Sequence, residues 1–288
     1  MLWFRAPAKI NLTLHVIGRR ADGFHEIESL VAFGGICDWL GYEPGADLTL
    51  EVCGPRAVES GAVGDNLVLR AARALAARIP RLTLGRFRLV KRLPAAAGLG
   101  GGSADAAAAL RALADANGLP IQDGRLQEAA LETGSDVPVC LSPRARMMAG
   151  IGDRVGPQVT LPCVFAVLVN PRVAAPTGKV FEALGLAPGS SVRSPGPGLS
   201  TLDQNEPLTL NSLVSCRNDL EAGALRVAPA IADVLERLSR LPDAKVTRMS
   251  GSGATCFALF DNRRSASTAR RRIAADQPDW WVKATVLR

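Results

Sequence analysis

A glycine-rich segment, Pro94–Asp105, constrains the fold of this chain more than any other part, because four of the five residues 98–102 are glycine. Glycine lets the backbone take positive φ and approach a ligand closely. The preceding residues 86–93 predict a strand that ends at Pro94, and the Ala- and Leu-rich residues 106–117 predict a helix. A strand, a glycine loop and a helix start in this order are typical of a phosphate-binding site.

The loop differs from the two commonest phosphate loops. A P-loop would need Lys and then Ser or Thr after Gly102, and the dinucleotide fingerprint would need a third glycine at position 103. The alternative interpretation is a turn that only lets a helix pack closely. For the helix itself, we expect Ser103 as the N-cap, Asp105 in the first turn and Gly118 as the stop.

Composition excludes several classes of protein. No apolar run reaches the roughly 18 residues of a membrane span, and the N-terminus lacks the pattern of a signal peptide. The six cysteines include no C-x-x-C pair, which favours reduced thiols in the cytoplasm over a zinc site or disulfides. The net charge of +7 fits a soluble surface rich in Arg, which is the plainer interpretation, or an anionic ligand. The densest basic run, 263–272, has no interleaved aromatics, so we expect no nucleic-acid partner.

Residues 8–16 alternate between apolar and polar side chains and predict a half-buried strand. Its polar face carries Lys9, Asn11, Thr13 and His15. Because Lys and Asn are poor strand formers, this face is either an ordinary solvent-facing side or a functional surface.

Turn and cap signals divide the rest of the first half. Residues 19–23 predict a hairpin turn followed by a return strand. Asp65-Asn66 predicts the cap of a helix with apolar residues at helical spacing, and 123–133 predicts another helix that stops at Gly134. Asp136 follows in a tight turn, where the plain interpretation is a turn or cap residue.

The second half continues the mixture of strands and helices. We expect a mobile loop or linker at 185–207, which is rich in Pro, Gly and Ser. The other expected elements are a strand at 161–169, a helix at 230–241, a strand–turn–strand at 246–260, a helix at 263–275 and a strand at 281–287. Since the strands come in hairpins, the fold class is α+β. The character of the sequence changes after Arg144, and we expect domains at 1–147 and 148–288.

Four segments in order resemble the GHMP kinases, the superfamily of galactokinase, homoserine kinase and mevalonate kinase. They are Pro7–Leu12, Leu93–Ala107, Gly134–Pro138 and Met249–Ala254. The resemblance covers most of the chain. It implies two α+β domains with the active site in the cleft between them, ATP bound by the first half, and an acceptor covered by the second.

Residues 18–26 resemble the members that transfer the ATP γ-phosphate to a 2-hydroxyl of an acceptor bearing a cytidine diphosphate group, in non-mevalonate isoprenoid synthesis. This chain departs from the pattern at Ala96 and Ala104, where many relatives have Gly and Ser, and at Phe24, where Tyr is usual. Two alternatives stay open. One is a homoserine- or mevalonate-type kinase; the other is a non-catalytic ligand-binding sensor, which does not need Lys9 and Asp136.

The resemblance also implies residue roles. Asp136 is the base or orients the hydroxyl, with Lys9 as its partner. ATP is held by the loop and by two more distant residues: Pro94, Ala95, Ala96, Ala97, Gly98, Leu99, Gly100, Gly101, Gly102, Ser103, Ala104, Asn66 and Lys91. The acceptor is held by Asn11, Phe24, His25, Thr177 and Phe181, with cytosine between the two Phe rings. Mg2+ accompanies ATP, with Ser103 as a candidate ligand. We expect a small-molecule substrate and a monomer or weak homodimer.

Overall fold

The computed structural model describes residues 1–192 and 208–288, and the chain forms two compact units. Unit 1 consists of Met1–Lys9, Ile36–Ala95 and Gly100–Pro143, and unit 2 of Ile10–Gly35, Ala96–Leu99 and Arg144–Arg288. The expected domain boundary after residue 147 lies shortly after the last segment of unit 1, and it stays a prediction. Among the described residues, no helix combines the length and apolar character that a membrane crossing needs.

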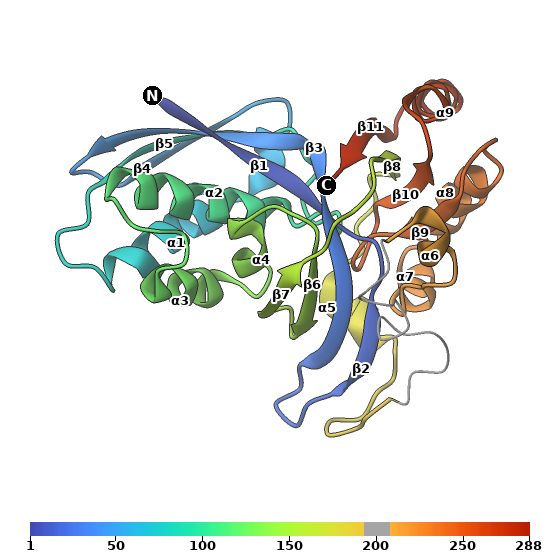
Figure 1. The fold of residues 1–288 in the computed structure, drawn as a ribbon, viewed down its shortest axis with the longest axis horizontal. Helices are drawn as coiled ribbons and strands as arrows, with labels where there is room; N and C mark the ends of the chain where they lie inside the picture. The colour runs from blue at the N-terminus through green and yellow to red at the C-terminus, as the bar shows by residue number, and fades with distance from the viewer. Residues whose placement is uncertain (193–207) are drawn as a thin grey trace. The chain divides into compact units, whose positions relative to one another are not determined.

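Unit 1 is a small sheet covered by helices (Figure 1). The parallel pair β4 (Thr49–Cys53) and β5 (Leu84–Val90) continues antiparallel into the second part of β3 (His25–Gly45), and β1 (Leu2–Asn11) also pairs with β3. Four helices of this unit pack on one another: α1 (Leu67–Ala76), α2 (Gly101–Ala116), α3 (Gly124–Thr133) and α4 (Val137–Leu141). Of these, α1 contacts β4 and α2 contacts β5, and the short 3-10 turns Ala57–Ser60 and Val63–Asp65 precede them.

The caps of α1 and α3 confirm the expected helix boundaries. Asn66 Oδ1 accepts a hydrogen bond of 3.0 Å from the Val68 amide and so caps α1. Asp123 caps α3 in the same way, and that helix ends at Gly134. Each cap satisfies a backbone N–H that has no partner inside its helix, which is why these short polar side chains fix the helix starts.

The expected start of α2 was wrong. The helix begins at Gly101, and its N-cap is Gly100, which lies in the left-handed region at φ 59°. The Gly100 carbonyl accepts the Ala104 amide at 2.8 Å, so Ser103 is already helical and does not cap. Asp105 therefore falls beyond the first turn, where it is buried. The expected end is confirmed, since the helix stops at Ala116 and Gly118 takes φ 64°.

Unit 2 contains an antiparallel sheet in the order β11-β8-β10-β9. Its strands are β8 (Val164–Asn170), β9 (Val246–Met249), β10 (Cys256–Phe260) and β11 (Trp281–Leu287). Helix α8 (Ala230–Ser239) packs on β9 and β10, and α9 (Arg263–Asp276) packs on β8 and β11 (Figure 1). These elements confirm the mixed α+β class and the expected strands and helices of this half.

A second group of strands in unit 2 surrounds the first part of β3. There β3 pairs antiparallel with β2 (His15–Arg19) and with β6 (Arg146–Gly150), which in turn pairs with β7 (Arg154–Gln158). The helices α5 (Thr177–Glu182), α6 (Leu210–Val214) and α7 (Glu221–Val227) complete the unit. Of the loop expected at 185–207, residues 193–207 lie outside the described residues, while the Gly189 and Val192 amides donate to carbonyls of β2.

The half-buried strand expected at 8–16 was wrong in two respects. The strand breaks after Asn11, and β2 starts at His15. Its polar side is as buried as its apolar side, since Lys9, Asn11, Thr13 and His15 are each at most 4% exposed. Buried polar groups are costly without partners, so the solvent-facing interpretation of this side is excluded.

Candidate active site

Lys9 on β1 and Asp136 form an ion pair in unit 1. Lys9 Nζ lies 2.9 Å from Asp136 Oδ2. Asp136 is the residue before α4, and its side chain makes no capping hydrogen bond to that helix. The interpretation of Asp136 as a plain helix cap is therefore excluded, because its carboxylate contacts an ammonium group instead of the backbone.

The two left-handed glycines of the loop make contacts that a side chain would prevent. At Gly100 a Cβ would lie 3.1 Å from Lys9 Cε, so the loop runs directly against the lysine of the ion pair. At Gly98, with φ 72°, a Cβ would lie 2.2 Å from the Ser250 carbonyl oxygen. Both positions therefore require glycine, for conformation and for space.

Residues 96–99 of the loop are held in unit 2 by Ser250 of the fourth family segment and by Thr255, which follows that segment. Ser250 Oγ donates to the Gly98 carbonyl at 2.8 Å, and the Thr255 amide donates to the Ala97 carbonyl at 3.2 Å. Asn218 Nδ2 in turn donates to the carbonyls of Met249 and Gly251, both at 2.8 Å. The glycine turn after β9 thus fixes the middle of the loop.

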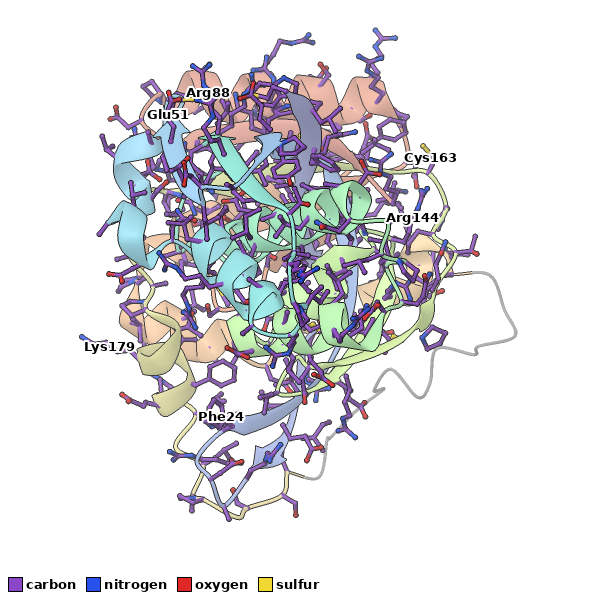
Figure 2. The ribbon with its side chains drawn as sticks, turned by 90° about the vertical axis from the view of Figure 1, so that its left-hand side faces the viewer. Phe24, Glu51, Arg88, Arg144, Cys163 and Lys179 are labelled. Atoms are coloured by element: carbon purple, nitrogen blue, oxygen red, sulfur yellow. The ribbon has the colours of Figure 1, made fainter. Side chains whose placement is uncertain are left out.

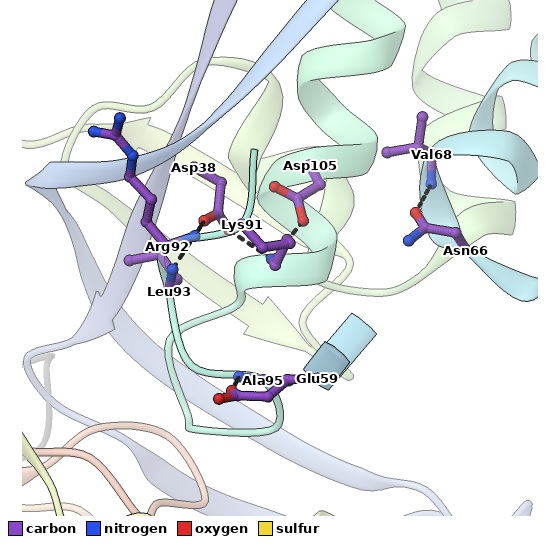
Figure 3. Close-up of polar contacts among 9 residues, drawn as sticks. All are labelled: Asp38, Glu59, Asn66, Val68, Lys91, Arg92, Leu93, Ala95 and Asp105. Atoms are coloured by element: carbon purple, nitrogen blue, oxygen red, sulfur yellow. Dashed lines mark hydrogen bonds and ion pairs between the residues drawn. The ribbon is translucent and has the colours of Figure 1, made fainter. Parts of the chain in front are cut away.

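A buried charge cluster supports the part of the loop that belongs to unit 1 (Figure 3). Lys91 Nζ lies 2.5 Å from Asp38 Oδ2 and 2.7 Å from Asp105 Oδ2. Asp38 Oδ1 also accepts the amides of Arg92 and Leu93, at 2.5 and 2.9 Å. One ammonium group therefore connects β3, the chain entering the loop and helix α2.

Two acidic residues of this support were not predicted. Glu59 Oε2 accepts the Ala95 amide at 3.1 Å at the entrance of the loop (Figure 3). Asp38 is the one acidic residue in the mostly apolar stretch 29–42 of β3, and a carboxylate in such a stretch is the signal that sequence reasoning missed. Since the Lys91 ammonium is engaged with carboxylates, its expected adenosine contact stays a prediction.

The cluster holds two carboxylates for one ammonium away from water. Burial raises the pKa of Asp105 to about 8, and Asp38 adds to this effect while Lys91 opposes it. Burial acts to lower the pKa of Lys91, but the carboxylates of Asp105 and Asp38 outweigh it and raise that pKa. Asp105 Oδ1 is buried without a hydrogen-bond partner among the described residues. Burial therefore disfavours the ionised form of Asp105.

The expected acceptor residues of unit 2 include an aromatic cluster. The rings of His25 and Phe181 stack with centroids 4.7 Å apart. Phe24 is 58% exposed on the turn between β2 and β3, at the same end of unit 2 as α5 with Lys179 (Figure 2). Burial, with a smaller effect of Arg19, lowers the pKa of His25. Its Nε2 has no hydrogen-bond partner within the part of the chain that the structure describes.

The remaining expected residues are placed as follows. Asn11 is buried and donates from Nδ2 to Ser29 Oγ at 2.7 Å. Thr177 is exposed at the start of α5, and its Oγ1 lies 2.9 Å from Ser252 Oγ. Unit 1 thus holds the ion pair, the ends of the glycine loop, Asn66 and Lys91, whereas unit 2 holds residues 96–99 and all five expected acceptor residues.

Two family descriptions match this sequence. The GHMP kinases N terminal domain matches residues 66–144, and the GHMP kinases C terminal matches residues 203–279. The glycine loop lies in the first match and the turn that holds it lies in the second. The chain belongs to the GHMP kinase family.

Within this family, the chain is similar over nearly its whole length to kinases that share one name. The chain is 58% identical to 4-diphosphocytidyl-2-C-methyl-D-erythritol kinase of Xanthobacter autotrophicus over 99% of this chain and 98% of that protein. The kinase of the same name from Methylobacterium radiotolerans is 55% identical over the same shares. A crystal structure of 4-(cytidine 5'-diphospho)-2C-methyl-D-erythritol kinase has a TM-score of 0.76 at 32% identity and covers 99% of both chains.

Other GHMP kinases share the fold alone. The Methanococcus jannaschii mevalonate kinase has a TM-score of 0.67 at 9% identity, with 100% of this chain and 98% of that chain covered.

Proposed function

We propose that this chain transfers the γ-phosphate of ATP to the 2-hydroxyl of 4-diphosphocytidyl-2-C-methyl-D-erythritol, giving the 2-phosphate and ADP in non-mevalonate isoprenoid precursor synthesis. The observation that carries the proposal is the aromatic cluster of His25 and Phe181 beside the exposed Phe24, in a chain whose near-full-length relatives bear this kinase name. Two aromatic rings suit a flat nucleobase, whereas homoserine and mevalonate offer no ring to stack.

The acceptor group is recognised in two parts in this proposal. Phe24 and Phe181 sandwich the cytosine once the His25 ring leaves its stack with Phe181, and Nε2 of His25, buried and without a partner among the described residues, then meets the hydrogen-bonding edge of the base. Stacking accepts any base, since every base has a π-face, so the choice of cytosine comes from the edge contact. Asn11 and Thr177 contact the polar remainder of the acceptor.

Phosphoryl transfer needs positioning and charge stabilisation more than covalent chemistry. The acceptor oxygen forms a bond to the γ-phosphorus as the bond from that phosphorus to the bridging oxygen of ADP breaks. The hydroxyl proton passes to the Asp136 carboxylate, or is oriented by it, while the Lys9 ammonium stabilises the negative charge that develops. The amides of residues 98–104 at the start of α2 hold the phosphates.

Mg2+ fits this chain as a companion of ATP. Within residues 1–192 and 208–288, no three His, Cys, Asp or Glu side chains gather as a metal site. The hydroxyl of Ser103, half-buried in the first turn of α2, is the protein group that would contact the ion beside the ATP phosphates. When bound, the ion neutralises phosphate charge. The expected state of monomer or weak homodimer stays a prediction.

The test is ATP consumption with a panel of alcohol acceptors. We expect a much higher kcat/KM for the cytidine-diphosphate derivative of methylerythritol than for methylerythritol phosphate, homoserine or mevalonate. Equal kcat/KM for the derivative and methylerythritol phosphate would mean that the enzyme ignores the nucleotide. Preference for homoserine or mevalonate would move the chain to another branch of the family, and binding without turnover would favour a sensor.

A further inference from the structure

Ser29 on β3 lies at the centre of a buried hydrogen-bond relay in unit 2. Its side chain is completely buried, and its Oγ lies 2.5 Å from the carbonyl oxygen of Thr13 and 2.7 Å from Nδ2 of Asn11. Neither the family segments nor the proposed mechanism uses this serine.

The chemistry of the three groups fixes the direction of the relay. A backbone carbonyl can only accept, so the single hydroxyl hydrogen of Ser29 must point to Thr13. Ser29 then has only lone pairs left for Asn11. The amide group of Asn11 must therefore turn its NH2 toward Ser29 and its Oδ1 away from it.

The backbone of Asn11 is fixed in the same way. Its N–H donates to Ser250 Oγ at 3.1 Å, and the Ser250 hydroxyl donates its only hydrogen to the Gly98 carbonyl. Asn11 is thus held at both its backbone and its side chain by hydroxyl groups that can only accept from it.

Asn11 Oδ1 faces the glycine turn after β9. A Cβ on Gly251 would lie 3.3 Å from this oxygen, so the missing side chain leaves space there. Within the described ranges 1–192 and 208–288, no side chain or amide donates a hydrogen bond to Oδ1. A fixed, unpartnered carbonyl oxygen accepts from a hydroxyl group and is disfavoured next to a phosphate or carbonyl oxygen.

We propose that Ser29 is a positioning residue that fixes the Asn11 amide, so that Oδ1 accepts a hydrogen bond from a hydroxyl of the methylerythritol group. The proposal rests on the proposed function. Without Ser29 the amide can rotate and present NH2 instead, so that the same hydroxyl would have to accept from Asn11 rather than donate to it, in a different orientation. Ser29 thereby contributes to selection of a hydroxyl-bearing acceptor without touching it.

The experiment is a double-mutant cycle with Ser29→Ala, Asn11→Ala and the double variant, measured as kcat and KM for the cytidine-diphosphate acceptor and for ATP. We expect Ser29→Ala to raise the acceptor KM about tenfold, the size of one lost hydrogen bond, and to leave the KM for ATP within about twofold. In the Asn11→Ala background, Ser29→Ala should change the acceptor KM less than about twofold, because its effect passes through Asn11.

Thr13→Val is the matched control for loss of stability. It removes the buried acceptor of the Leu30 amide, a hydrogen bond of 3.0 Å, but leaves the contacts from Ser29 to Thr13 O and Asn11 intact. We expect an unchanged acceptor KM in this variant. An acceptor KM of Thr13→Val that rises as much as that of Ser29→Ala would mean that the effect is one of packing, and it would overturn the proposal. The proposal would also be overturned if Ser29→Ala raised the acceptor KM equally in the wild-type and Asn11→Ala backgrounds.

The proposed function and this proposal fail in different ways. An active wild-type enzyme whose Ser29→Ala variant has an unchanged acceptor KM contradicts the positioning role alone. A folded wild-type enzyme that does not use this acceptor contradicts the proposed function, and the positioning role toward that acceptor with it.

Discussion

Lys9 and Asp136 form an ion pair whose two side chains differ in their access to solvent. The Lys9 side chain is 5% exposed and the Asp136 side chain 34%, although their charged atoms lie 2.9 Å apart. Burial and the backbone of Gly100 hold the lysine in place, whereas the carboxylate is open on one side. The solvent-facing side of the Asp136 carboxylate is therefore accessible without displacement of Lys9.

Asp136→Asn should lower kcat by on the order of 10²-fold or more, because the amide cannot accept the hydroxyl proton. ATP affinity should change little, since the glycine loop is untouched. Steady-state kinetics with the cytidine-diphosphate acceptor and calorimetric titration of a non-hydrolysable ATP analogue measure the two effects. Asp276→Asn, at an exposed position on α9, is the matched charge control. Near-normal turnover of folded Asp136→Asn enzyme would remove this residue from the mechanism.

Gly100→Ala should lower turnover by displacing Lys9. The new Cβ would lie 3.1 Å from Lys9 Cε, and alanine at φ 59° costs about 1–2 kcal/mol. Urea unfolding gives the stability loss, and kcat of the folded enzyme gives the displacement. Gly124→Ala in α3 meets no atom within 4 Å and should not destabilise the protein. Identical kcat values for Gly100→Ala and wild type would show that the loop does not position the lysine.

Asp105→Asn should remove a pH dependence of stability. The pKa of Asp105 is about 8 in the folded chain and about 4 in the unfolded chain, so the folded state binds more protons between these pH values. The contribution of this proton to the free energy of unfolding is therefore complete below about pH 4. It declines as the pH rises and is lost once the pH has passed about 8.

The measurement is the free energy of unfolding in urea at about pH 5, 6, 7 and 8. Wild type should lose stability relative to Asp105→Asn with a slope of up to about 1.4 kcal/mol per pH unit. Parallel pH profiles of the two proteins would mean that Asp105 is not the group that carries the extra proton.

Phe24→Ala should weaken acceptor binding about tenfold to a hundredfold. One stacking contact with a base contributes roughly 1–3 kcal/mol, and about 1.4 kcal/mol corresponds to tenfold. Phe24→Tyr should cost little, since the ring is kept. Acceptor affinity by calorimetry distinguishes the two, with the partly exposed Leu131→Ala as a control for loss of an apolar surface group. Equal affinities of Phe24→Ala and wild type would place the cytosine elsewhere.

His25→Ala should narrow the preference for cytidine over uridine acceptors. Nε2 of His25 is buried and has no hydrogen-bond partner among the described residues, so a base edge that reaches it would supply one; burial keeps the pKa of this imidazole below its ordinary value. The ratio of kcat/KM for the two acceptors is the readout. An unchanged ratio would assign base selection to a different group.

The parts of the site that depend on local sequence could be predicted. Asn66 caps α1 and Gly134 ends α3 because caps and stops act within a few residues. The pairing of Lys9 with Asp136 followed from the family resemblance, since their separation of over a hundred residues gives no local signal. The expected roles of these residues remain predictions.

The supports of the site could not be predicted, because they depend on tertiary contacts. Asp38, Glu59 and Ser29 lie far along the chain from the groups that they hold, and single polar residues in strands or turns have many ordinary uses. Ser103 failed as a cap because a left-handed Gly100 already supplied the helix start. The burial of His15 could not be predicted either, because the alternating apolar and polar residues of 8–16 are typical of a strand with one solvent-exposed face.

The pairing of Phe33 with Arg288 joins two segments that the ribosome makes at very different times. These residues exchange backbone hydrogen bonds of 2.9 and 3.1 Å, and Gly34 is the register partner of Leu287, about 250 positions later. Ribosomes add about 5–20 residues per second, so residues 33 and 34 of β3 are made on the order of tens of seconds before residues 287 and 288, with which they pair. An unpaired strand is prone to association with other chains, so newly made protein has an interval in which chaperone binding should favour its yield.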